Sequence, residues 1–530
     1  MPQDSASQTG TIARAAGTVS LAVLASRILG LVREQVFAGL FGAGLAFDAF
    51  VVAFRIPNLL RDLFAEGALS SAFVTVFTDY DQRLGREKTW QLANNVVFCF
   101  TLLLSLLVMV GMWFSPDIVG VMAPDFGTVP GKLGLTALMT RIMFPFLILV
   151  SLAALAMGVL NTKGKFFVPS LASSFFNLGS VVTGVGLSLA APRFGVAPIV
   201  GMAWGTLVGG FLQLMVQVPL LWRVGFRLRF VLQLREPGLM RIVKLMLPAM
   251  VGLSATQINI FINTFYASSC AQGSVSWLNY AYRLFHLPMG LFGVALMVAT
   301  LPVVSRHAAN RNLAALRDAL NSSLSLAILV TMPAACGLIF LAQPIIGLIY
   351  QHGQFTAVDT QQTAAALALY SLGLVAFAGV KIIVPVYYAL DDTRIPVLGA
   401  FVTVAANLFI IHLTLAALQH RAIALSTSLS MILNFIFLAA VLYRKLSGFE
   451  VRGLILTLFK VAGASVIMGL AVHWLHPHAT AWLGAGLGGQ ALGLAGVIAI
   501  GMGLYVAMVS QLQIPEFQEL VRHVRSKLNH

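Results

Sequence analysis

Long runs of apolar residues recur along the chain from Gly17 almost to the C-terminus, and short polar stretches separate them. A helix of roughly 20 apolar residues crosses the hydrocarbon core of a bilayer. Because the runs are continuously apolar rather than alternating, they do not suit an outer-membrane barrel. The pattern predicts an all-α polytopic membrane protein with about 14 transmembrane helices near residues 17–43, 46–80, 91–114, 134–160, 167–191, 197–222, 246–270, 275–303, 319–342, 360–389, 396–418, 422–443, 453–476 and 484–511.

Composition and charge agree with this class. Of the 530 residues, 59% are hydrophobic and 10% are charged, whereas soluble domains carry about 25% charged residues. With the N-terminus inside, the inner loops and tails hold 22 Lys and Arg residues, and the outer loops hold only Lys132, Arg193 and Arg421. Cytoplasmic loops collect Lys and Arg. The asymmetry predicts that both termini are cytoplasmic, and basic cytoplasmic loops explain the net charge of +15 better than nucleic-acid binding does.

Eight basic residues fall inside the predicted spans, namely Arg27, Arg33, Arg55, Arg61, Arg141, Arg283, Lys381 and Lys460. Each would cost about 2.5–3.5 kcal/mol if it faced lipid, so most must face a polar cavity or a partner. Guanidinium groups that converge on a cavity favour an anion with many oxygens, such as phosphate. The alternative is a set of structural ion pairs, because the first two spans also carry Glu34, Asp48, Asp62 and Glu66. Arg283 favours a substrate site, since its own span contains no acid.

An internal repeat relates two parts of the chain. Arg55 and Arg283 lie in similar segments 228 positions apart, and Asn177 and Asn407 are separated by 230 positions. Parallel repeats of this kind are typical of transporters whose substrate site lies between the halves. The repeat predicts an N-lobe over 1–225, a C-lobe over 226–446, a final helix pair over 447–511 and an amphipathic cytoplasmic tail over 512–530, which we expect to lie on the membrane surface.

Other motifs favour structural roles. Gly201, Gly205 and Gly209 form a stripe that is typical of close helix packing. Asp79 and Asp81 could form the metal–diphosphate pair of a membrane enzyme, but no supporting motif accompanies them. His473, His476 and His478 fit a solvated loop better than a metal site. The chain has no phosphate-binding GxxxxGK[ST] loop, so we expect no metal, cofactor or ATP-driven transport.

The segments SRILGLVRE (26–34), DAF (48–50), AFRIPNLLR (53–61), FAEGALSSAFV (64–74), GSVSWLNYAYRL (273–284) and QHGQF (351–355) resemble the MurJ/MviN family of lipid II flippases. That family belongs to the multidrug/oligosaccharidyl-lipid/polysaccharide exporter superfamily. The resemblance implies two six-helix lobes around a central cationic cavity, with the last helix pair as a groove for a polyprenyl tail. It places the diphosphate-binding residues at Arg27, Arg33, Arg61 and Arg283, with Asp48 as a functional acid.

Further residues are expected at the cavity, namely Glu34, Arg55, Glu66, His286 and Lys381. His286 stands where some relatives have a glutamate.

The sequence thus predicts a flippase, not an enzyme, for peptidoglycan biosynthesis in the cell wall. It would move lipid II, an undecaprenyl-diphosphate-linked muropeptide, from the inner to the outer leaflet of the bacterial cytoplasmic membrane by alternating access. A drug or metabolite antiporter of the same superfamily and an integral membrane enzyme acting on polyprenyl-linked sugars are the alternatives. The expected partners are lipid II, membrane lipids and proteins of cell-wall synthesis or division.

Overall fold

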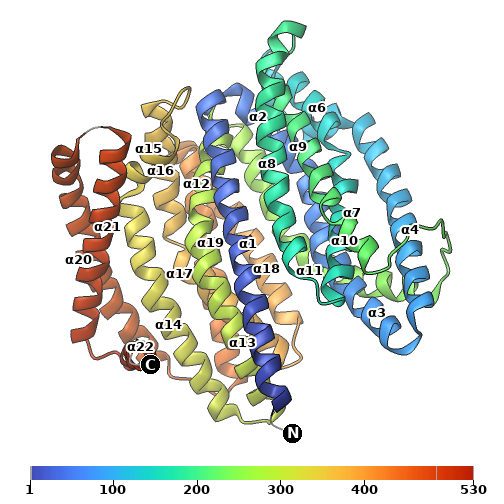
Figure 1. Cartoon of the computed structure of the whole chain (residues 1–530). Helices are drawn as coiled ribbons and strands as arrows, with labels where there is room; N and C mark the ends of the chain where they lie inside the picture. The colour runs from blue at the N-terminus through green and yellow to red at the C-terminus, as the bar shows by residue number, and fades with distance from the viewer. Residues whose placement is uncertain (1–2, 485, 529–530) are drawn as a thin grey trace. The chain divides into compact units, whose positions relative to one another are not determined.

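The computed structural model describes residues 3–484 and 486–528, and these residues form helices and connecting segments with no strand among them. This confirms the all-α polytopic class. The chain divides into two compact units between Gly273 and Ser274. The first unit (Figure 1) contains α1 (Gln3–Phe41), α2 (Leu45–Arg61), η1 (Asp62–Leu69), α3 (Ser70–Arg83), α4 (Arg86–Trp113), α5 (Ser115–Met122), η2 (Pro124–Thr128), α6 (Lys132–Met143), α7 (Phe146–Thr162), α8 (Phe167–Ala190), η3 (Ala191–Phe194), α9 (Ile199–Met215), α10 (Val218–Arg223) and α11 (Pro237–Ser268).

The second unit continues from Ser274 and is also helical over the described residues. It contains α12 (Ser274–Pro288), η4 (Met289–Gly293), α13 (Val294–Ala309), α14 (Leu313–Phe340), α15 (Ala342–Tyr350), α16 (Ala357–Ser371), α17 (Leu374–Ala389), α18 (Arg394–Leu418), α19 (His420–Lys445), α20 (Val451–Leu483), α21 (Leu487–Gln511) and α22 (Pro515–Leu528).

Among the described residues, 11 helices are long and apolar enough to cross a membrane, or up to 12 if α16 and α17, which meet at a bend of 42°, form one span. The two predicted spans outside this set are α1 and the run α2–η1–α3. These two carry most of the intramembrane charge, which lowers their mean hydropathy. The structure therefore supports a polytopic protein and does not confirm the count of 14.

The helix α11 was predicted to open the C-lobe, but it packs against η1 and α3 within the first unit. The compact units are defined by which helices pack together, whereas the predicted lobes are defined by the repeat in the sequence. The lobe boundaries remain a prediction.

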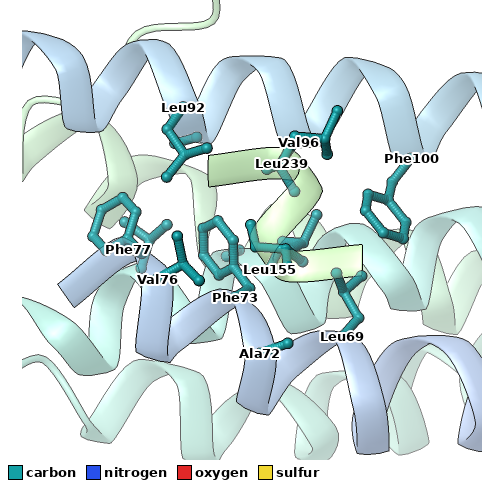
Figure 2. Close-up of a cluster of buried hydrophobic side chains, with 14 of the residues drawn as sticks. Leu69, Ala72, Phe73, Val76, Phe77, Leu92, Val96, Phe100, Leu155 and Leu239 are labelled. Atoms are coloured by element: carbon teal, nitrogen blue, oxygen red, sulfur yellow. The ribbon is translucent and has the colours of Figure 1, made fainter. Parts of the chain in front are cut away.

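The core of the first unit lies where α3, α4, α7 and α11 meet. Phe73 and Phe77 of α3 lie beside Leu92 and Val96 of α4, and Leu239 of α11 packs into the same cluster (Figure 2). These side chains recur at helical spacing, so each helix turns one apolar face to its neighbours. The cluster also includes Leu69, the last residue of η1, so it positions η1 and the helix α2 that precedes it.

The C-terminal helix uses its apolar face differently from the sequence prediction. Phe517 and Val521 of α22 pack into a cluster with Leu329 of α14 and Val509 of α21, so this face covers protein rather than lipid. The amphipathic pattern correctly predicts a helix. Periodicity alone does not distinguish a membrane surface from a protein surface as the partner of that face.

The glycine stripe of α9 allows its backbone to approach α8 closely (Figure 1). A Cβ atom on Gly205 would lie 2.6 Å from the Cα of Gly184, and one on Gly201 would lie 2.3 Å from the backbone nitrogen of Ser188. These contacts are with backbone atoms, which cannot rotate away. The packing role predicted for the stripe is confirmed.

A Gly205→Ala substitution is therefore expected to destabilise the protein by about 1–3 kcal/mol, because the added methyl group forces α8 and α9 apart. Gly186→Ala on α8 is the matched control, since a Cβ atom there meets no atom within 4 Å. Alanine also raises helix propensity, so this control should be neutral or stabilising. Thermal unfolding of the detergent-solubilised protein measures the stability of both variants. Equal melting temperatures for Gly205→Ala and Gly186→Ala would contradict the close packing of α8 against α9.

Candidate cation site in the membrane helices

The predicted site residues of α1 lie against α8. Arg33 and Glu34 are both buried, and the Nη2 of Arg33 donates to the Oε1 of Glu34 at 3.0 Å. The guanidinium of Arg33 also lies 5.3 Å from the ring centroid of Phe176. The side chain of Asn177 donates to the carbonyl of Ser26 at 3.1 Å, which fixes the same stretch of α1. These contacts set the position of Arg33.

Nearly two turns earlier on α1, Arg27 differs from Arg33 in its exposure. Arg27 is exposed, and it lies on the same helix as the buried Arg33–Glu34 pair. An exposed guanidinium on a membrane helix fits either a polar cavity or a headgroup surface.

The second predicted cluster lies at the junction of α2 and η1. Arg55 is half-buried on α2, and Arg61 ends that helix. The Nη2 and Nε of Arg61 donate to one carboxylate oxygen of Asp62 at 2.8 and 3.1 Å. The predicted cavity acid Glu66 belongs to η1, and its side chain lies outside the described residues. Arg61 is therefore oriented by its own neighbour at the point where the helix changes form.

Two π-helical segments lie at corresponding positions of the sequence repeat. The π-helical segment η1 (Asp62–Leu69) follows Arg61, and the π-helical segment η4 (Met289–Gly293) follows Pro288. Adding the repeat offset of 228 to Arg61 gives Met289. π-Helical turns are rare and frequently mark functional sites. The spans that carry Arg61 and Arg283 therefore have the same departure from α-helical geometry, whereas α1, which carries Arg27 and Arg33, is α-helical throughout.

The second unit brings three predicted site residues together. Arg283 and His286 are exposed on α12, and Lys381 is exposed on α17. The ring of His286 lies within electrostatic range of both cations, and its centroid is 4.3 Å from that of Tyr282. The charged groups that act on His286 are thus both positive. Such a cluster favours an anionic ligand over a cationic one.

Asp48 is buried near the start of α2. Its carboxylate is buried and accepts from the Nζ of Lys132 at 3.0 Å and from the backbone N–H of Gly273 at 2.9 Å. Lys132 was predicted to lie in an outer loop, but it is a buried first residue of α6, and its Nζ lies 4.0 Å from the ring centroid of Phe126. Asp48 therefore ties the start of α2 to α6 and to the segment after α11. Sequence reasoning missed Lys132.

Two further intramembrane cations have partners at helix ends. The Nε of Arg141 donates to the hydroxyl of Ser115 at 2.8 Å, and the Nζ of Lys460 donates to the carbonyl of Leu512 at 3.0 Å. These contacts satisfy the charges locally. Neither residue belongs to the candidate site.

The acids weighed as an enzymatic pair are engaged in ion pairs. Asp79 contacts Arg83 at 2.7 Å and Arg241 at 2.6 Å, while Asp81 contacts Lys163 at 2.6 Å. These pairs link α3 to α7 and α11. No group of three or more His, Cys, Asp or Glu side chains that could hold a metal ion occurs within the described part of the chain.

Comparison with known proteins identifies the family. The family model described as lipid II flippase MurJ matches residues 37–486. A probable lipid II flippase of Vibrio cholerae is 33% identical over 510 residues, which cover 94% of this chain and 95% of the relative. A lipid II flippase of Burkholderia cenocepacia is 35% identical over 465 residues, covering 87% of this chain and 89% of the relative.

The chain belongs to the MurJ family of lipid II flippases.

Solved structures agree with this membership. A lipid II flippase in an inward closed conformation matches with a TM-score of 0.78 at 27% identity, covering 95% of this chain and 99% of that one. An inward-facing multidrug transporter of the MATE family matches with a TM-score of 0.64 at 15% identity, covering 80% and 94%. The second match shows a shared fold alone. The family is one of lipid II flippases, so neither the drug antiporter nor the membrane enzyme is favoured.

Proposed function

We propose that this protein carries undecaprenyl-diphosphate-linked muropeptide from the inner to the outer leaflet of the bacterial cytoplasmic membrane, with both termini in the cytoplasm. Family membership supports the substrate. The distribution of 22 inner against three outer basic residues supports the orientation. The observation that carries the site assignment is the grouping of Arg283, His286 and Lys381 on two helices of the second unit.

In this proposal the diphosphate is held by Arg27, Arg33 and Arg61 of the first unit and by Arg283 of the second. A guanidinium has five N–H donors, so a contact with one carboxylate does not exhaust its capacity. The bonds from Arg33 to Glu34 and from Arg61 to Asp62 would pre-orient these side chains before the lipid arrives. Arg55 and Lys381 would add positive charge around the same phosphates.

Alternating access would require the two repeat halves, 1–225 and 226–446, to rock about the bound diphosphate. The π-helical segments η1 and η4 are the proposed bending points, because they lie beside site residues in both halves. We assign the final helix pair, 447–511, to the polyprenyl tail.

The contribution of Lys381 can be measured by titrating purified protein with lipid II. A Lys381→Gln substitution is expected to weaken binding up to about fivefold, because losing one exposed positive charge near the phosphates costs up to about 1 kcal/mol. Lys165→Gln is the control, since Lys165 is exposed in the loop between α7 and α8. Equal affinities for Lys381→Gln and wild type would exclude Lys381 from the site.

A further inference from the structure

The segment between α10 and α11 is extended and is pinned to α4 by two buried asparagines (Figure 1). The side chain of Asn94 accepts from the N–H of Arg229 at 2.8 Å and donates to the carbonyl of Arg227 at 3.1 Å. Asn95 accepts from the N–H of Gln233 at 2.7 Å and donates to its carbonyl at 2.9 Å. Each amide thus pairs with the segment as a neighbouring strand would, which keeps residues 227–233 extended.

Successive side chains of an extended chain point to opposite sides. Within the extended residues 227–233, the odd positions carry the exposed Arg227 and Arg229, followed by Val231 and Gln233. The even positions carry large apolar side chains that are 42–77% exposed, namely Leu228, Phe230 and Leu232. Leu234 and Arg235, in the turn that follows, are also exposed. Residues 227–235, which we call the α10–α11 ribbon, therefore have an extended part with one arginine-bearing edge and one apolar edge.

The apolar edge continues the outer face of α4. The ring of Phe230 packs edge-on against that of Phe98 of α4, with centroids 5.1 Å apart. Further along α4, Leu102 and Leu106 are more than half exposed, and this helix is one of those able to cross a membrane. The ribbon thus lies beside a surface that faces lipid.

The length of α4 locates the ribbon relative to the bilayer. A helix of 28 residues is about 42 Å long, which exceeds the ~30 Å hydrocarbon core. Asn94 and Asn95 lie about 12–14 Å from its first residue, so the ribbon falls near the boundary between acyl chains and headgroups. Trp222, which is 55% exposed just before the ribbon, suits the same level, because tryptophan is enriched at membrane interfaces.

We propose that the α10–α11 ribbon binds the anionic phospholipid surface, with its arginines on headgroup phosphates and its apolar edge among the upper acyl chains. The charge of the ribbon favours this occupant, since three arginines and no acid lie within 227–235. This site is separate from the proposed diphosphate site.

The test uses the full-length protein in nanodiscs of phosphatidylcholine with one quarter phosphatidylglycerol. A single nitrobenzoxadiazole fluorophore is attached to Leu232→Cys or, as the matched control, to Gln233→Cys on the opposite edge. Either lipid is supplied in brominated form as a quencher. We expect quenching at position 232 to be at least threefold stronger than at 233, and brominated phosphatidylglycerol to quench at least twofold more than brominated phosphatidylcholine.

A triple variant, Arg227→Gln with Arg229→Gln and Arg235→Gln, should retain quenching at position 232 but lose the preference for phosphatidylglycerol. A label at Leu228→Cys repeats the measurement if Leu232→Cys fails to fold. Absence of quenching at positions 232 and 228 would place the ribbon in water, available to a soluble protein, and would overturn the proposal. Quenching without any headgroup preference in the wild-type ribbon would overturn its anionic-lipid part.

Discussion

An Arg283→Ala variant is expected to fail to support growth of cells depleted of their own flippase, although it reaches the membrane at the wild-type level. The loss of a charge-assisted contact with phosphate costs about 1.5–3 kcal/mol, which corresponds to roughly 10–150-fold weaker binding of lipid II. Insertion should not suffer, because removing an intramembrane charge lowers the cost of insertion. Growth complementation and titration with purified lipid II measure the two effects.

Two further variants sharpen this result. Arg283→Lys should restore part of the function, because an ammonium keeps the charge but lacks the bidentate geometry. Arg306→Ala is the matched control, since Arg306 is an exposed arginine of the same unit at the end of α13. If Arg283→Ala binds lipid II as tightly as Arg306→Ala does, Arg283 is a structural residue.

The second large effect is expected at the buried pair of Asp48 and Lys132. Asp48→Ala leaves the Lys132 ammonium, whose side chain is 5% exposed, without this carboxylate. Removing one partner of a buried ion pair costs about 3–5 kcal/mol, whereas replacing both partners by apolar residues is often nearly neutral. Asp48→Ala should therefore lower the melting temperature strongly, and Asp48→Leu combined with Lys132→Met should recover most of the loss.

The matched control for this pair is Lys163→Met. Lys163 contacts Asp81 at 2.6 Å, but both side chains are about one quarter exposed, so its removal should cost less than about 1 kcal/mol. Thermal unfolding in detergent compares the variants. A melting temperature for Asp48→Ala equal to that of Lys163→Met would contradict a stabilising role for the buried pair.

Hydrophobic patterning predicted most of the fold, because a membrane span is a local property of about 20 residues. The glycine stripe of α9 is also a local signal, and its packing role is confirmed. The partner of Asp48 was not predictable in this way. Lys132 follows Val129-Pro130-Gly131, a sequence typical of a turn, and it meets Asp48 across 84 positions without any repeating pattern.

The candidate site was predictable in part. Arg283 stands out because its predicted span lacks an acid, and the mid-span position of Lys381 pointed to a polar environment. The electrostatic proximity of Lys381 to His286 depends on how α12 and α17 pack, which sequence periodicity does not specify. The extended stretch 227–233 does have a local signal, because it begins with the alternating residues Arg227, Leu228, Arg229 and Phe230, and alternation indicates an extended segment.

The most direct test of outward lipid II transport is leaflet-specific detection of lipid II in cells depleted of their own flippase, with a probe that reaches only the outer leaflet. Lipid II exposed to the probe should fall during depletion and return when this chain is expressed. Expression of Arg283→Ala at the same level should not restore it, and Arg306→Ala should. Lipid II that reaches the outer leaflet equally well without this chain would contradict the proposed transport.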